Sequence, residues 1–246
     1  MQYQAQPNFL KDKIILVTGA GDGLGQAAAK AYAQYGATVI LLGRTTKKLE
    51  KTYDDIVNAG HTEPAIYPLN LEGATPKDYE ELAQTLKEQF GALHGLLHNA
   101  AILGVTTPIQ QHDIDVWYKV MQVNLNAPFV MTRALLPLLR ETPGSKIIFT
   151  TDDKSTAYWG AYGISKDAVT SFMKILGDEL NTEEHAVQVN AINPGAVRTQ
   201  MRVRAFPGEN PDAMPLTDEV MPTYLYLMSD DCKEIAKTIH AQNQSK

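Results

Sequence analysis

The sequence has one cysteine and no long apolar run, and each scarcity excludes a class of protein. Cys232 has no second cysteine in the 246 residues with which to form an internal disulfide, which fits a reducing compartment. No apolar run approaches the roughly 20 residues that a membrane helix requires. The N-terminus lacks a basic stretch followed by an apolar one, so we expect no signal peptide and a cytoplasmic protein that does not enter a membrane.

Metal-ligand patterns and a basic excess are also missing. No Cys/His cluster has the spacing of a metal site. The formal net charge is −6, whereas a nucleic-acid-binding domain favours a basic face. We therefore predict neither a metal site nor a nucleic-acid partner. The content of 44% hydrophobic and 20% charged residues is that of an ordinary globular protein.

Short β-branched apolar runs alternate along the chain with longer amphipathic segments. Continuous apolar strands are typical of a parallel sheet that is buried on both faces, and their alternation with helices predicts a doubly wound α/β sheet. The predicted strands are 13–18, 37–42, 65–69, 95–99, 145–150 and 187–192, and the helices lie near 24–35, 46–59, 76–90, 113–140 and 161–182. We predict a single domain over residues 1–246, a Rossmann-type sheet of about seven strands with helices on both faces.

The first predicted strand runs into a glycine-rich turn. Residues 18–25 read TGAGDGLG, which puts Gly19, Gly23 and Gly25 between a strand and a helix. Positions without a side chain let backbone N–H groups and a helix N-terminus approach a pyrophosphate. The turn, including Asp22 and Leu24, is therefore predicted to bind a dinucleotide.

The second predicted strand lacks an acidic residue at its end. An acidic residue there would accept hydrogen bonds from the adenine ribose and select NAD, but this strand is followed by Gly43 and Arg44. A guanidinium can bind a 2′-phosphate, so we predict NADP (NADPH) in preference to NAD. Lys47 and Lys48 follow at a helix start, where each either assists or is simply solvated.

Tyr162 and Lys166 stand four residues apart, on one face of a predicted helix, and a phenol beside an ammonium group suits proton transfer. With this pair the sequence resembles the classical short-chain dehydrogenase/reductase family over nearly its whole length. The matching stretches are TGAGDGLG for the family's TGxxxGxG turn, HNAA (98–101) for NNAG, QVNLNAPF for the helix asparagine, YGISK for YxxxK and INPGAVRT (192–199) for PGxxxT. Finer details, such as VILLGR and WGAY, resemble a bacterial branch of uncharacterised YciK-like oxidoreductases.

The resemblance implies hydride transfer between a nicotinamide and a small-molecule carbonyl or secondary alcohol. Tyr162 would be the acid or base, and Lys166 would pull the tyrosine pKa toward neutrality and hold the nicotinamide ribose. Asn124 would hold a relay water on its backbone carbonyl, which Pro128 leaves free because proline has no N–H; a bend is expected there. Further cofactor contacts are implied at Asn70, Leu71, Asn99, Ala100, Pro194, Gly195, Val197 and Thr199.

The sequence departs from the family at the serine that usually holds the substrate carbonyl. Counting back from Tyr162 gives Phe149, so the loop is shortened, and anchoring on the strand KIIFT gives Thr151 or Asp152. A hydroxyl at Thr151 would orient a carbonyl, whereas an ionised Asp152 would raise the tyrosine pKa and repel a developing oxyanion. Ser155 on the shortened loop is a third candidate, and the residues leave all three open.

Two smaller departures favour an alternative function. Asn70 stands where the family has an aspartate, and Ala101 replaces the glycine of NNAG. With Asp152, they favour an NADP(H)-binding protein with little turnover, acting as a sensor or interaction module. The main hypothesis is an NADP-dependent oxidoreductase, with a substrate lid near 200–222. The resemblance further implies a homodimer or homotetramer through the helices near 113–140 and 161–182.

Overall fold

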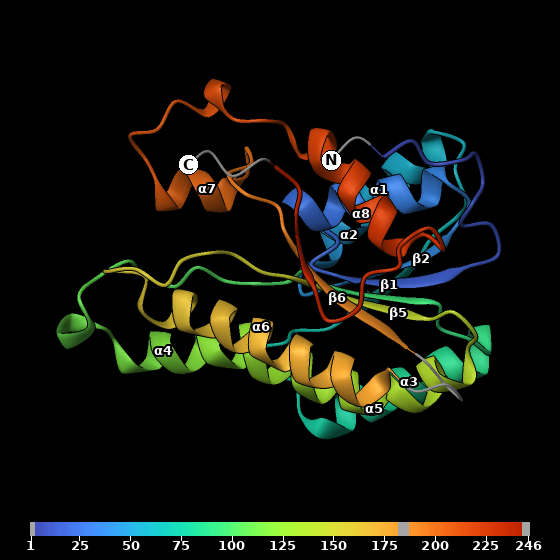
Figure 1. The fold of residues 1–246 in the computed structure, drawn as a ribbon, viewed down its shortest axis with the longest axis horizontal. Helices are drawn as coiled ribbons and strands as arrows, with labels where there is room; N and C mark the ends of the chain where they lie inside the picture. The colour runs from blue at the N-terminus through green and yellow to red at the C-terminus, as the bar shows by residue number, and fades with distance from the viewer. Residues whose placement is uncertain (1–2, 182–186, 243–246) are drawn as a thin grey trace.

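The computed structural model describes residues 3–181 and 187–242, which contain one seven-stranded parallel sheet (Figure 1). The strands are β1 (Ile14–Thr18), β2 (Thr38–Gly43), β3 (Ala65–Pro68), β4 (Gly95–His98), β5 (Lys146–Thr150), β6 (Gln188–Asn193) and β7 (Thr238–His240). They lie in the order β3-β2-β1-β4-β5-β6-β7, and every neighbouring pair is parallel. The predicted α/β class is confirmed.

Helices cover both faces of the sheet. They are α1 (Gly23–Gln34), α2 (Thr46–Asn58), α3 (Pro76–Phe90), α4 (Ile114–Met121), α5 (Ala127–Glu141), α6 (Gly160–Leu180), α7 (Gln200–Ala205) and α8 (Met221–Met228), with short 3₁₀ turns at Ile109–Gln111, Pro211–Ala213 and Thr217–Val220. In Figure 1, α1, α2 and α8 lie on one side of the sheet, while α3, α5 and α6 lie on the other. The sheet is therefore the middle of three layers.

The five inner strands, β1, β2, β4, β5 and β6, bury side chains on both faces, which explains why they read as continuous apolar runs. In β1, Ile15 and Val17 pack in the core that includes α1 and α8, whereas Leu16 packs in the core that includes α3, α5 and α6. All three side chains are fully buried. The alternation follows from the two-residue period of a strand.

The long helix predicted over 113–140 is instead two helices joined by a π-helical turn, Gln122–Asn126. The N–H of Ala127 donates to the carbonyl of Gln122, five residues back. Pro128 has no N–H to donate to the Asn124 carbonyl, so the backbone widens where the bend was expected. The predicted end of α6 at residue 182 lies outside the described residues.

The sequence placed a lid, but no helix, where α7 lies, and two further elements were not located from the sequence. β7 is only three residues long and carries a mixed pattern, Thr238–His240. α8 begins with Met221 and Pro222, which we assigned to the end of the predicted lid. Tertiary packing explains both elements, because β7 pairs with β6 and α8 packs on α1.

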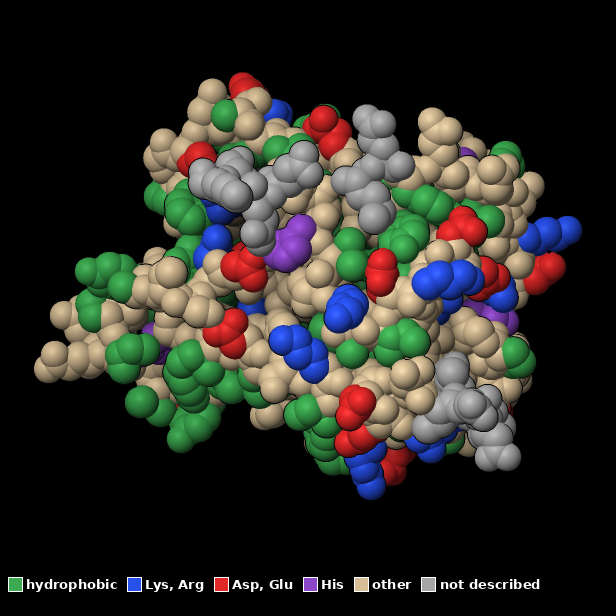
Figure 2. All heavy atoms as spheres, viewed as in Figure 1, with side chains coloured by type: hydrophobic (Ala, Val, Ile, Leu, Met, Phe, Trp, Pro, Cys, Tyr) green, Lys and Arg blue, Asp and Glu red, His purple; other side chains and the backbone are tan. Residues whose placement is uncertain are grey.

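The surface carries an apolar area at one end of the molecule. Figure 2 shows hydrophobic side chains gathered where α4 lies in Figure 1. The large exposed side chains of this part of the chain include Ile109, Ile114 and Tyr118. Within the described ranges, no helix combines the length and the hydropathy needed to cross a bilayer.

A buried histidine makes the fold sensitive to acid. His98 at the end of β4 pairs through Nε2 with the Thr132 hydroxyl at 2.8 Å and stacks on Phe149, with 4.8 Å between ring centroids. Burial lowers the pKa of His98 from 6.5 to about 3. Between pH 6.5 and 3, His98 is therefore protonated in the unfolded chain but neutral in the folded protein. The free energy of unfolding consequently decreases as the pH falls through this window.

We expect His98→Gln to flatten this acid response. The glutamine stays neutral and can still reach Thr132, whereas the native histidine costs roughly 2–3 kcal/mol of unfolding free energy between pH 7 and pH 4.5. Urea unfolding of both proteins at the two pH values measures the difference. Equal losses in the two proteins would assign the acid sensitivity to other groups.

Candidate active site

A cleft of about 1110 Å³ opens where the strand order reverses, at the carboxyl ends of β1 and β4. In open parallel sheets this position brings together loops from separate strands. Of the predicted cofactor contacts, the cleft is lined by Gly19, Asp22, Gly23, Leu24, Arg44, Asn70, Leu71, Asn99, Ala100, Tyr162, Lys166, Pro194, Gly195, Val197 and Thr199. The structure thus brings residues from six separate stretches of the sequence to one site.

The glycine-rich turn is closed tightly against α1. Gly19 and Gly23 have φ values of 70° and 51°, in the left-handed region that favours glycine. Gly25 does not line the cleft, but a Cβ there would lie 2.3 Å from the Gly19 carbonyl oxygen and 2.6 Å from Nδ2 of Asn99. The absence of this side chain keeps the start of α1 against the turn.

Asp22 caps α1 by accepting a hydrogen bond from the N–H of Gly23 at 2.8 Å. Its other carboxylate oxygen accepts from Nζ of Lys48, and this hydrogen bond is the main reason why the pKa of Asp22 is lowered. Lys48 and Arg44 line the same end of the cleft, whereas Lys47 does not. This end therefore offers two cationic side chains beside the helix N-terminus.

The ends of β1, β4 and β5 are joined by hydrogen bonds around Asn99. The Thr18 hydroxyl accepts from the N–H groups of Asn99 and Ala100, both at 3.0 Å. Nδ2 of Asn99 donates to the Thr18 carbonyl, and Oδ1 accepts from the Thr150 hydroxyl, both at 3.4 Å. Asn70 is arranged differently, since its Oδ1 accepts from the N–H of Glu72 and shapes the turn after β3.

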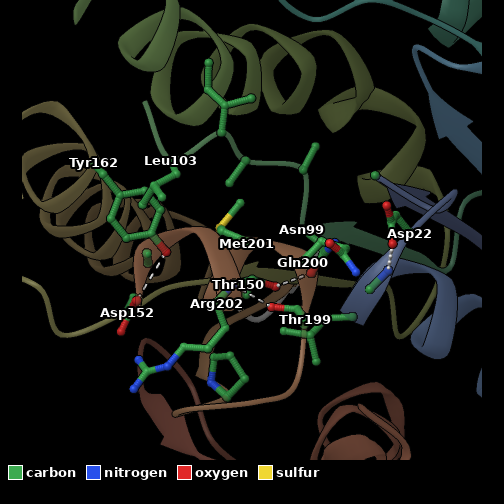
Figure 3. A pocket seen from close by; sticks show the side chains of 18 of the residues that line it. Asp22, Asn99, Leu103, Thr150, Asp152, Tyr162, Thr199, Gln200, Met201 and Arg202 are labelled. Carbon is green, nitrogen blue, oxygen red and sulfur yellow. Dashed lines mark hydrogen bonds between the residues drawn. The ribbon is translucent and has the colours of Figure 1, made fainter. Parts of the chain in front are cut away.

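Tyr162 and Lys166 lie side by side on α6 and are both buried. The Tyr162 hydroxyl donates to Oδ2 of Asp152 at 3.2 Å, and Figure 3 shows the two side chains pointing toward one another. Nζ of Lys166 donates to the Thr150 carbonyl at 2.8 Å and lies 5.8 Å from the centre of the tyrosine ring. A phenol, an ammonium group and a carboxylate thus meet at one point of the cleft.

Of the three residues considered for the serine position, Asp152 is the one whose side chain contacts Tyr162. The Thr151 hydroxyl is buried and turns toward α6, where it bonds the Thr170 hydroxyl at 2.7 Å and the Lys166 carbonyl at 3.3 Å. Ser155 is exposed and donates to Asp167. Thr151 lines the cleft, but its hydroxyl is engaged with α6, and which of the three residues fills the serine role stays a prediction.

The environment keeps the proton on Tyr162. Burial first, and then the charge and hydrogen bond of Asp152, raise the pKa of Tyr162 well above its ordinary value. This direction is opposite to the one expected from Lys166 alone. Burial lowers the pKa of Lys166 to about 8, although the Asp152 charge opposes the shift. At neutral pH the Tyr162 hydroxyl therefore keeps its proton.

Asn124 lies behind the wall of the cleft. Its side-chain amide binds both backbone groups of Ile102, accepting from the N–H at 2.8 Å and donating to the carbonyl at 3.0 Å. It also donates to the Ser165 hydroxyl at 3.1 Å. The side chain therefore ties the loop after β4 to α6, while the relay role of its backbone carbonyl stays a prediction.

The turn after β6 carries the remaining predicted contacts. Thr199 caps α7 by accepting from the N–H of Arg202 at 3.2 Å. Gly195 has a φ of 72°, and its N–H donates to Oδ1 of Asn193 at 2.9 Å. Gln242, which sequence reasoning missed, donates to the Pro194 carbonyl at 2.7 Å and so fastens the turn to the end of the described chain.

Two other lining residues were missed. The Phe206 ring, from the predicted lid, lies 5.6 Å from the ring of Trp159, which in turn lies 5.7 Å from Tyr162. Nζ of Lys154 lies 5.3 Å from the centre of the Trp159 ring and 3.7 Å from Oδ1 of Asp152. No local motif marks either residue; the one signal was an aromatic side chain in a segment predicted to cover the site.

Comparison with known proteins agrees with this geometry. The family model for short chain dehydrogenases matches residues 13–210. The uncharacterized oxidoreductase YciK of Escherichia coli (strain K12) is 43% identical over 236 residues, which is 95% of this chain and 92% of that protein. A Pseudomonas syringae structure has 47% identity and a TM-score of 0.94, covering 98% of this chain and 100% of its own.

A structure from Escherichia coli CFT073, solved in complex with NADPH, has 43% identity and a TM-score of 0.93. It covers 97% of this chain and 100% of its own. The matches thus extend over almost the entire chain in both sequence and structure. The protein belongs to the short-chain dehydrogenase/reductase family and is an oxidoreductase.

Proposed function

We propose that the protein transfers hydride between NADP(H) and a small carbonyl compound or secondary alcohol, with Tyr162 moving the proton. The observation that carries the proposal is the buried Tyr162–Lys166 pair within a cleft that the glycine turn also lines. The nicotinamide supplies or accepts the hydride when the dinucleotide is bound. The side chains of this protein would bind the cofactor, orient the substrate and move the proton.

The residues of the cleft fit such a dinucleotide. The left-handed glycines and the N-terminus of α1 offer backbone N–H groups for a pyrophosphate. Arg44 and Lys48 would bind a 2′-phosphate, Asn99 and Lys166 the nicotinamide ribose, and Thr199 the carboxamide. The NADPH complex of the related Escherichia coli CFT073 structure supports this choice of cofactor.

The proton would move from the Tyr162 hydroxyl to the substrate oxygen. Because the pKa of Tyr162 is raised and that of Lys166 is about 8, both groups carry their protons at neutral pH. Alcohol oxidation would instead require the phenolate, which Asp152 opposes. We therefore propose carbonyl reduction as the favoured direction.

The test combines cofactor binding with turnover. Fluorescence titration measures NADPH and NADH affinities, and the loss of NADPH absorbance follows reduction across a carbonyl panel. Tyr162-dependent consumption of NADPH with any member supports the proposal. Tight NADPH binding without NADPH consumption would favour the second candidate, a binding protein with little turnover. The Tyr162–Asp152 hydrogen bond is the observation that supports this candidate.

The proposed preference for NADPH makes a prediction for Arg44. We expect Arg44→Ala to weaken NADPH binding by about tenfold or more, the scale of a lost charge-assisted hydrogen bond, and to leave NADH binding unchanged. Lys47→Ala is the matched control, because Lys47 is exposed and does not line the cleft. Equal losses of affinity for NADPH and NADH would contradict the proposal that Arg44 binds the 2′-phosphate.

The proposal includes a lid and an oligomer. Arg202 on α7 pairs with both carboxylate oxygens of Glu209, at 2.6 and 2.8 Å, and its guanidinium stacks 3.8 Å from the ring of Phe206. This compact unit suits a segment, 200–222, that covers the substrate. Phe129 on α5 and Ile175 on α6 are half exposed, which supports association through these helices.

A further inference from the structure

Tyr162 has a single hydroxyl proton, and in this structure it is donated to Asp152 rather than toward open space. Resting on the proposed function, we infer that the substrate carries a protonated amine one or two carbons from its carbonyl carbon, and that Asp152 binds this amine. The residue is then a determinant of substrate class at the reacting centre. The amine would form an ion pair with the carboxylate, while the carbonyl faces Tyr162.

A neutral ketone has no group that satisfies this carboxylate. Its carbonyl oxygen would compete with Asp152 for the same tyrosine proton and would develop negative charge beside the carboxylate during reduction. An ammonium group donates to Asp152 and so releases the Tyr162 hydroxyl to donate to the carbonyl. It also offsets the Asp152 charge that raises the tyrosine pKa.

The protein's own side chains illustrate how a cation fits here. The Lys154 ammonium lies 3.7 Å from Asp152 and 5.3 Å from the centre of the Trp159 ring. A carboxylate beside an aromatic face is the combination that binds ammonium ligands. The Lys154–Asp152 ion pair is longer than a hydrogen bond, so a substrate amine that donates directly to Asp152 can replace the lysine.

The distance between the two contacts limits the substrate. Oδ2 of Asp152 and the Tyr162 hydroxyl are 3.2 Å apart, so an amine and a carbonyl that bind them must be close neighbours in the molecule. Leu103, which lies beside the tyrosine in Figure 3, and the rings of Trp159 and Phe206 offer apolar contacts for the rest of it. Arg202 adds little repulsion, because Glu209 already holds it.

The reaction balances with the established oxidoreductase chemistry. The carbonyl carbon gains a hydride as NADPH is oxidised to NADP⁺, and the carbonyl oxygen gains the Tyr162 proton. Solvent returns a proton to the tyrosine. The ammonium group keeps its charge throughout, and the product is an amino alcohol.

The experiment compares amino ketones with neutral ketones of the same size: aminoacetone with butanone, and 2-amino-1-phenylethanone with propiophenone. We expect the wild-type kcat/KM to be about tenfold or more higher for each amine, the scale of a hydrogen bond between charged groups. Asp152→Asn and Asp152→Ser should both lose this preference. Asp152→Ser should in addition reduce the neutral ketones faster than the wild type does.

Asp153→Asn is the matched control for charge. Asp153 accepts from Nδ2 of Asn193 at 2.8 Å and lies 3.9 Å from His240, so removing it should leave the amine preference in place. Loss of the preference in this variant alone would overturn the assignment to Asp152. Equal wild-type rates on amino and neutral ketones would overturn the inference and leave the proposed reductase function standing.

Failure of the proposed function gives a different result, with no NADPH consumed on any ketone. Calorimetry of 1-amino-2-propanol with the NADP⁺-loaded protein then decides the inference separately. Binding that is lost in Asp152→Asn supports it, with 2-butanol as the neutral comparison. Equal binding of the two alcohols, or none, overturns it.

Discussion

Tyr162→Phe is expected to lower NADPH-dependent carbonyl turnover by about a hundredfold to ten-thousandfold, the usual contribution of a positioned general acid. The substitution removes the only proton that Tyr162 offers and keeps the ring that packs against Trp159. NADPH affinity should not change, because Lys166 and the glycine turn remain. Steady-state rates and a fluorescence titration measure the two quantities on the same preparation.

Tyr158→Phe is the matched control for Tyr162→Phe. Tyr158 lies four residues away, is 61% exposed and does not line the cleft, so its loss of a hydroxyl should leave turnover intact. If the Tyr162→Phe variant kept wild-type rates, another group would have to donate the proton. The Lys166 ammonium, with a pKa of about 8, would then be the next to test.

Gly25→Ala is expected to weaken NADPH binding by at least about tenfold. The new methyl group would lie 2.3 Å from the Gly19 carbonyl oxygen, and backbone cannot yield as a flexible side chain would. Opening the turn by this much costs on the order of 1–3 kcal/mol, and each 1.4 kcal/mol is tenfold in affinity. Titration with NADPH, together with the thermal unfolding midpoint, measures the effect.

Gly208→Ala controls for the loss of a glycine. A Cβ at Gly208 meets no atom within 4 Å, so this variant should bind NADPH as the wild type does. If folded Gly25→Ala bound NADPH normally, the glycine turn would not be the pyrophosphate site. A variant that loses stability without losing affinity would give Gly25 a role in packing alone.

The fold was predictable because apolar periodicity reports burial on both faces of a parallel sheet. All six predicted strands are present, with bounds that differ by at most one residue at either end. β7 was not predicted because three residues are too few to show a periodic pattern. Its position is decided by pairing with β6. The π-helical turn was only partly predictable: Pro128 indicates a disrupted helix but not the form of the disruption.

The serine position shows where strand periodicity stops being a guide, because the candidates lie beyond the end of β5. Phe149 packs against the side of the sheet that α6 covers, and Thr151, two residues on, faces the same side. Asp152 lies two residues beyond the end of β5, in the loop before α6, and from there its side chain reaches Tyr162. Counting back from Tyr162 leads to Phe149, a core residue, and the alternation along β5 ends at Thr150, so neither pattern could choose among the three candidates.

Lys154 and Gln242 could not be predicted, and Phe206 only as part of the lid, since each reaches the cleft from a loop or from the end of the described chain. Their positions depend on how the segments after β5 and β6 fold back. Sequence separation hides such contacts: Trp159 and Phe206 are far apart along the chain, yet their rings lie 5.6 Å apart. Loop geometry of this kind follows from three-dimensional packing rather than from local pattern.

A chain of hydrogen bonds runs from Lys166 through Thr150 and Asn99 to Thr18 and connects α6 with the ends of β5, β4 and β1. They fasten α6 and the glycine turn to three neighbouring strand ends, so the register of the sheet sets the distance between Lys166 and the turn. Substitutions in the segment 200–222 would therefore change the walls of the cleft without moving these strand ends. Asp152 is different, because it contacts Tyr162 directly, and a change there would alter both the cleft wall and the tyrosine.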